Sequence, residues 1–145
     1  MKLFSFTSRR SRGFTLIELL VVLVILGMLA GLVGPRLFSN VDKSKVKTAE
    51  TQVKMLRGSL QTYRLDVGAY PNTEQGLAAL MSKPGDVNNW QGPYLEDEVP
   101  KDPWNNPYVY KSPVENLQGF ALYSLGADGK PGGDSLDTDI GYLEK

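Results

Sequence analysis

The sequence predicts an α+β protein in which a long N-terminal α-helix packs on a small antiparallel sheet. Residues 14–35 form an almost unbroken apolar run. Residues 46–67 carry apolar side chains at spacings of three and four, and residues 68–145 are rich in glycine, proline, asparagine and aromatic residues. A spanning run, an amphipathic helix and a short-stranded region together indicate a membrane-tethered domain with one small core.

The apolar run is long enough to cross a membrane. At about 1.5 Å per residue, the 22 residues from Phe14 to Pro35 span roughly 33 Å, against a hydrocarbon core of roughly 30 Å. Residues 1–13 carry a charge of +4 and the remainder carries −4. Under the positive-inside rule the basic end stays in the cytoplasm and the rest of the chain lies on the far side.

The other interpretation of this run is a secretory signal peptide that is cleaved after it. Two features count against that interpretation. Residues 29–32 match a signal-peptidase site poorly, and Glu18 places a carboxylate inside the apolar run. An intramembrane carboxylate costs several kcal/mol, so it indicates a function.

Beyond the span, one apolar stripe predicts an amphipathic helix that packs on a sheet. The stripe comprises Val46, Ala49, Val53, Leu56, Leu60, Tyr63 and Val67. Gly31, Gly34 and Pro35 lie between the two halves of the helix. Because Pro35 donates no backbone hydrogen bond, we expect a kink there and a point that melts locally when subunits pack.

Residues 68–145 predict a globular head of short elements. Asn72 or Thr73 is expected to cap a short helix that runs to about Met81. Residues 108–110 and 120–125 have the composition of strands, and the proline-rich residues 89–107 are expected to form an ordered loop.

Four carboxylates, Asp128, Asp134, Asp137 and Asp139, lie among glycines near the C-terminus. Hard oxygen ligands on a flexible loop suit Ca²⁺, which takes six to eight oxygens. The spacing is not that of an EF-hand, and a solvated acidic turn is the alternative interpretation.

Composition narrows the possible chemistry. The chain has no histidine, the commonest general base, and no cysteine for a thiolate metal site or a disulfide. Its formal net charge of zero argues against general nucleic-acid binding. We therefore predict a protein that is not an enzyme and has no catalytic residues.

Two groups of motifs resemble a known family. Residues 12–18, Arg-Gly-Phe-Thr-Leu-Ile-Glu, resemble the class III signal of type IV pilins and pseudopilins. Tyr70-Pro71, residues 102–108 and residues 124–129 resemble the major pseudopilin of the type II secretion system. The fold implied is type IV pilin-like. Asn105 stands where the family usually has glycine, which asparagine replaces if its backbone is left-handed.

The resemblance implies a processing site and an assembly site. A prepilin peptidase would cut between Gly13 and Phe14 and methylate the new amino terminus of Phe14. Glu18 would then pair with the N-terminal amine of a neighbouring subunit, with Pro35 as the flexible point in assembly. The alternative for Glu18 is that its side chain reaches the headgroup region.

The resemblance also implies a structural calcium ion in the C-terminal loop. The ligands carried over by position are the side chains of Asp128, Asp137 and Asp139, together with the backbone carbonyl of Leu125. The loop length varies among relatives, so a role for Asp134 stays open.

The function implied is that of a structural subunit of the type II secretion pseudopilus, a periplasmic helical filament that drives export of folded proteins across the outer membrane. Implied partners are further copies of the chain, minor pseudopilins, the prepilin peptidase, the inner-membrane assembly platform with its ATPase, and the membrane. The expected organisation is a cleaved leader (1–13), a membrane-spanning helix (14–38), an amphipathic helix (39–67) and a periplasmic head (68–145). The subunit would cross the inner membrane once, with its N-terminus in the cytoplasm.

Three alternatives stay open. A type IV pilin usually carries a C-terminal cysteine pair, which this chain lacks. A minor pseudopilin generally lacks the combination of Asp102-Pro103-Trp104 with residues 126–129. A membrane-anchored calcium-dependent hydrolase would use paired carboxylates such as Asp137 and Asp139, although no nucleophile or phosphate-loop motif accompanies them.

Overall fold

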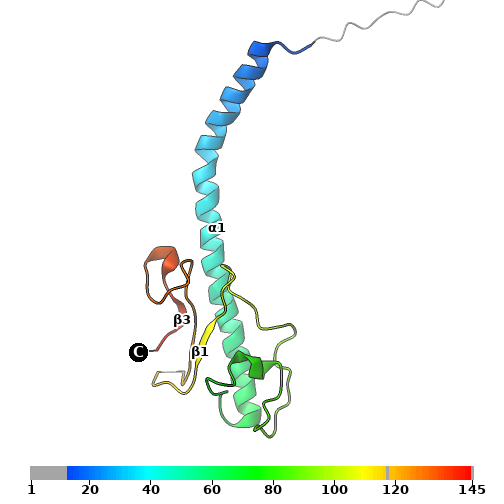
Figure 1. Cartoon of the computed structure of the whole chain (residues 1–145), viewed down its shortest axis with the longest axis vertical. Helices are drawn as coiled ribbons and strands as arrows, with labels where there is room; N and C mark the ends of the chain where they lie inside the picture. The colour runs from blue at the N-terminus through cyan, green and yellow to red at the C-terminus, as the bar shows by residue number, and fades with distance from the viewer. Residues whose placement is uncertain (1–12, 117, 145) are drawn as a thin grey trace, which may run out of the picture. The chain divides into compact units, whose positions relative to one another are not determined.

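The structure, a computed structural model, describes residues 13–116 and 118–144. Helix α1 (Leu16–Val67) is followed by the 3₁₀ helix η1 (Leu77–Leu80), the strands β1 (Val109–Lys111) and β2 (Ala121–Ser124), the 3₁₀ helix η2 (Ser135–Asp137) and the strand β3 (Ile140–Tyr142) (Figure 1). The chain divides into two compact units, residues 1–39 and 40–145. Apart from Gly13, the predicted leader lies outside the described residues.

In the first unit, α1 presents apolar side chains on all its faces. The large apolar side chains from Leu16 to Val33 are 49–84% exposed. In the described part of the chain, α1 is the one helix that is long and apolar enough, by length and composition, to cross a membrane. It continues through Pro35 without interruption, and the expected kink and weak point there stay predictions.

In the second unit, the strands form one antiparallel sheet in the order β1-β2-β3. The ends of β1 and β2 lie within one residue of the predicted strands, but β3 was not predicted. It is only three residues long and contains Gly141, a residue depleted in strands. Gly141 has a φ of 142°, and a Cβ there would collide with the Leu122 carbonyl of β2, so the pairing requires glycine.

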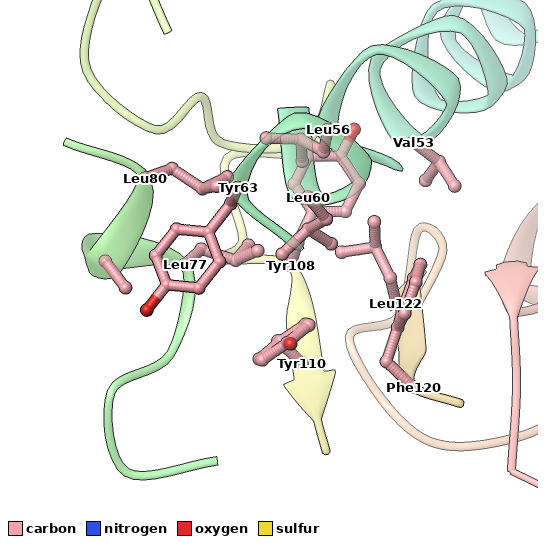
Figure 2. Packing of buried hydrophobic residues seen from close by; sticks show 11 residues of the cluster. Val53, Leu56, Leu60, Tyr63, Leu77, Leu80, Tyr108, Tyr110, Phe120 and Leu122 are labelled. Atoms are coloured by element: carbon pink, nitrogen blue, oxygen red, sulfur yellow. The ribbon is translucent and has the colours of Figure 1, made fainter. Parts of the chain in front are cut away.

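The predicted apolar stripe of α1 is confirmed as the centre of the core. Figure 2 shows Val53, Leu56 and Leu60 of α1 facing side chains from the sheet and from η1. The buried partners of the stripe are Leu77, Ala79, Leu80, Tyr108, Tyr110, Phe120 and Leu122. One helix face therefore organises η1 and the sheet around a single core.

Two buried tyrosines of this core carry satisfied hydroxyls. Tyr110 donates to the Pro71 carbonyl at 2.8 Å, and Tyr108 donates to Gln52 Oε1 at 2.6 Å. Burial raises the pKa of both phenols far above the usual value, so both stay neutral donors. The Tyr110 bond joins β1 to the chain that follows α1, and the Tyr108 bond joins the residue before β1 to α1 itself.

The prediction of a short helix that runs to Met81 is only partly confirmed. Asn72 caps the turn as predicted: its Oδ1 accepts the Gln75 backbone N–H at 2.8 Å, and Gln75 Oε1 accepts the Asn72 N–H at 2.9 Å. Gly76 then leaves the helical region, with φ 58° and ψ −165°. The chain continues only as the single 3₁₀ turn of η1, because Gly76 interrupts the helical hydrogen-bond pattern.

Asp102 anchors the loop that precedes β1. Its buried carboxylate accepts the backbone N–H groups of Trp104 and Asn106 at 3.1 and 2.8 Å and the Ser124 hydroxyl at 2.5 Å. Ser124 Oγ in turn accepts the Gly126 N–H at 3.1 Å, at the start of the C-terminal loop. Asn105 has a φ of 71°, so its backbone is left-handed, the condition under which asparagine replaces the family's usual glycine.

The core predicts that two leucines of α1 differ in how much they contribute to the free energy of unfolding. Leu60 is fully buried and Leu65 is 84% exposed. Leu60→Ala is expected to reduce the free energy of unfolding by about 3 kcal/mol, because the truncated side chain leaves a cavity in the core. Leu65→Ala, the matched control, is expected to change it by under about 0.5 kcal/mol. Urea unfolding of the detergent-solubilised full chain measures both, and equal effects would contradict this role of the buried stripe.

Candidate functional site

The first turn of α1 is closed by a reciprocal pair of side chains. Thr15 donates its backbone N–H and its hydroxyl to Glu18 Oε2, both at 2.9 Å. The Glu18 backbone N–H donates to Thr15 Oγ1 at 3.2 Å. This arrangement is a capping box, in which each residue satisfies a donor that the helix end leaves unpaired.

The role of Thr15 was not predicted from the sequence. The signal was present, because Thr-x-x-Glu directly before an apolar run is the sequence pattern of a capping box. In this full-length chain the Glu18 carboxylate is therefore engaged with the N-terminal end of its own helix. Its predicted pairing with a neighbouring subunit is not tested by one copy and stays a prediction.

The predicted cleavage site lies just before this capping box. Gly13, Phe14 and Thr15 have no regular secondary structure, and Phe14 is 89% exposed. Arg12, the first residue of the predicted signal, lies outside the described residues. An exposed peptide bond in non-helical backbone suits a protease, because a helical peptide bond must first unfold to enter an active site.

The C-terminal loop, residues 125–139, folds back on itself. The Ala127 N–H donates to the Leu136 carbonyl at 2.9 Å, which joins the two sides of the loop. Gly126 and Gly133 both have left-handed backbones, with φ values of 70° and 85°. A Cβ at either position would come within 2.8 Å of the Asp137 carbonyl oxygen, so these glycines permit the close packing.

The predicted calcium ligands are placed in this loop but are not gathered around one point. Leu125 follows β2 directly, and Asp128 Oδ1 accepts the Lys130 N–H at 2.9 Å. The Asp137 side chain is half-buried, and Asp134 is exposed and precedes η2. Within residues 13–116 and 118–144, no three acidic, histidine or cysteine side chains come together in an arrangement that could hold a metal ion.

Asp139 shows the strongest sign of a missing partner. Its Oδ2 accepts the Gly132 N–H at 2.9 Å, whereas its Oδ1 is buried and accepts no hydrogen bond. An unpaired buried carboxylate oxygen is costly, and a cation would satisfy it. The oxygen ligands of this loop are also the type that Ca²⁺ prefers, so the residues present fit the ion.

A long apolar N-terminal helix, capped by Thr15 and Glu18, and an α+β head built on its second half define a filament subunit of the type IV pilin class. The family model described as "Type II secretion system (T2SS), protein G" matches residues 36–143. The prokaryotic N-terminal methylation motif matches residues 8–34. The chain belongs to the type II secretion system protein G family.

Individual relatives agree with this assignment. The "Type II secretion system core protein G" of Pseudomonas aeruginosa is 49% identical over 137 residues, which cover 92% of this chain and 95% of that protein. The protein of the same name from Vibrio cholerae is 43% identical over 136 residues, 92% of each chain. The crystal structure of the major pseudopilin from the type 2 secretion system of enterohaemorrhagic Escherichia coli matches with a TM-score of 0.60 and 35% identity, over 73% of this chain and 92% of that one.

Two glycines of the C-terminal loop predict different losses of stability on substitution by alanine. Gly132 and Gly133 both have left-handed backbones, but a Cβ at Gly132 meets open space whereas one at Gly133 meets Asp137. Gly132→Ala is expected to cost about 1 kcal/mol of unfolding free energy through backbone strain alone. Gly133→Ala is expected to cost at least about 2 kcal/mol, because the loop must also shift. Thermal unfolding and amide exchange within the loop measure this, and equal behaviour of the two variants would show that the close approach to Asp137 is unimportant.

Proposed function

We propose that this chain is made as a precursor, is anchored in the inner membrane by the first part of α1, and polymerises into the pseudopilus after cleavage between Gly13 and Phe14. The observation that carries the proposal is the Thr15–Glu18 cap at the start of an apolar helix, within a matched N-terminal methylation motif. Basic residues precede the span, so the head would lie in the periplasm.

Cleavage would change what Glu18 can do. The cut creates a positively charged amine at Phe14, four residues before Glu18. In the hydrocarbon core of a filament, a carboxylate and an amine from two subunits stabilise each other, because each offsets the desolvation cost of the other. Glu18 would therefore set the axial register between subunits, and the apolar surface of residues 16–33 would be covered by neighbouring helices.

The partners that this function requires are a prepilin peptidase at Gly13–Phe14 and an inner-membrane assembly platform with its ATPase. Minor pseudopilins would complete the filament. The assignment to the protein G family, whose solved relative is titled a major pseudopilin, favours the major subunit over a minor pseudopilin or a type IV pilin.

We also propose a structural calcium site in the C-terminal loop, formed by Asp128, Asp137, Asp139 and the carbonyl of Leu125. The buried, unpaired Oδ1 of Asp139 supports it. When bound, the ion would cross-link a loop that contains no fully buried large side chain of its own. Asp128 and Asp137 would turn toward the ion from their positions in the present structure, which the glycines at positions 126, 129, 132 and 133 permit.

Filament formation tests the role of Glu18. Glu18→Ala is expected to leave membrane insertion and cleavage intact and to lower filament yield at least about tenfold, because the intersubunit charge pair is lost. Glu74→Ala, an exposed acid in the second unit, is the control and should assemble normally. The measurement is the amount of sheared filament relative to membrane-bound subunit, and a normal yield from the Glu18 variant would refute the pairing.

Thermal unfolding tests the calcium site. Calcium in excess over its dissociation constant is expected to raise the midpoint of the full chain, whereas magnesium should not. Asp139→Ala should abolish the calcium-dependent rise, and Asp97→Ala, an exposed acid elsewhere, should retain it. An identical calcium response of the Asp139 variant and the parent chain would eliminate this site.

A further inference from the structure

A groove runs along one side of the second half of α1. It lies between Gln52, Met55 and Ser59 of the helix and the loop from Tyr94 to Pro100, and has a volume of about 510 Å³. A second hollow continues it past Thr62 to Asp66 and shares Met55, Tyr94 and Leu95 with the first. Met55 is 47% exposed, so the floor of the groove offers apolar surface that the head itself does not cover.

The rim of this groove is acidic. Glu96, Asp97 and Glu98 are consecutive, exposed and part of its lining. The ion pairs found among the described residues are Lys47–Glu50 and Lys111–Glu144, so none of the three rim acids is paired with a cation in residues 13–116 and 118–144. An apolar floor with an acidic rim suits lysine, whose long stem packs on apolar surface while its ammonium group reaches a carboxylate.

The same head carries a row of lysines on α1. Lys43, Lys47 and Lys54 are all exposed, and their spacings of four and seven place them on one face of the helix. Of the three, only Lys47 is paired within the described part of the chain, with Glu50 at 3.2 Å on the exposed surface. Exposed pairs of this kind contribute little and exchange readily for a better partner.

The groove and the lysine row lie on opposite flanks of α1. We measure the angle of each residue about the helix axis from the centre of the buried stripe, at roughly 100° per residue. The three lysines lie about 120–160° round the helix from the stripe in one direction. Gln52, Met55 and Ser59 lie about 60–120° round it in the other. Two complementary surfaces on different flanks of one molecule form head-to-tail contacts, which build open helical filaments unless the rotation between subunits closes a ring.

We propose that the acidic groove of each subunit receives the lysine row of a second copy of this chain in the filament. This inference rests on the proposed filament function and adds the head surfaces that make the contact. It also specifies a geometry. The lysines are centred about seven residues before the groove residues of α1, so contacting subunits are offset by roughly 11 Å along the helix axis.

Charge reversal tests the contact in the full-length chain, expressed in a bacterium whose own copy has been removed. Reversing the rim (Glu96→Lys, Asp97→Lys, Glu98→Lys) or the lysine row (Lys43→Glu, Lys47→Glu, Lys54→Glu) should each lower filament yield about tenfold at equal membrane levels. The two sets combined should restore it. The control reverses two exposed acids elsewhere on the head, Glu74 and Glu115, and should assemble normally.

A cysteine pair tests the same contact while removing only one charge from each of the two surfaces. The chain has no cysteine, so Asp97→Cys with Lys47→Cys provides one reactive pair without background. A short bis-maleimide should link neighbouring subunits of sheared filaments into dimers and longer ladders. Glu115→Cys with Lys47→Cys is the matched control and should remain monomeric.

The outcomes separate this inference from the proposed function. Normal filaments from both reversed variants overturn the contact and leave the filament function standing. The contact is equally overturned if those filaments are normal and export alone is lost, which would mean that another protein occupies the groove. Loss of yield without rescue by the combined variant, together with absent cross-links, also overturns the contact. Failure of the unmodified chain to form any filament overturns the function itself.

Discussion

The burial of one stripe of α1 against the sheet is the interaction on which the rest of the head depends. Leu56, Leu60 and Tyr63 lie in the core together with side chains from η1, β1 and β2 (Figure 2). The strands are only three or four residues long, and a sheet of this size is not stable without a packed face. The second half of α1 is therefore both the scaffold of the head and part of its core.

One helix serves two environments, and this explains how its surface is divided. Residues 16–33 present apolar side chains all round, which suits lipid before assembly and other helices after it. The second half buries a single stripe and leaves its flanks exposed, where the proposed contact would place neighbouring heads. Buried hydrogen bonds also hold the loops of this small head: Asp102 joins the segment before β1 to Ser124 at the end of β2. Assembly can then use the flanks of α1 without disturbing the core.

Much of the fold could be predicted because period and length are properties of the sequence itself. The apolar run, the stripe and two strands could be predicted from spacing and composition. The left-handed backbone of Asn105 was only a condition for replacing glycine, and the structure meets that condition. Strand β3 could not be predicted, since its three residues form a strand only by pairing with β2. The short helix begins only at Leu77, because Gly76 adopts a non-helical conformation that its neighbours do not reveal. At the candidate calcium site, the acidic character of the loop could be read from the sequence, but the unpaired state of Asp139 Oδ1 depends on the fold of the whole loop.

The central claim is that the chain becomes a filament subunit by losing its leader at the start of α1. Intact mass and N-terminal sequence of the protein recovered from its native membrane test that claim most directly. We predict a chain that begins at Phe14 and carries one added methyl group on its amino terminus. A chain that begins beyond Gly31 would contradict the claim, because the apolar helix and Glu18 would then be absent from the mature protein.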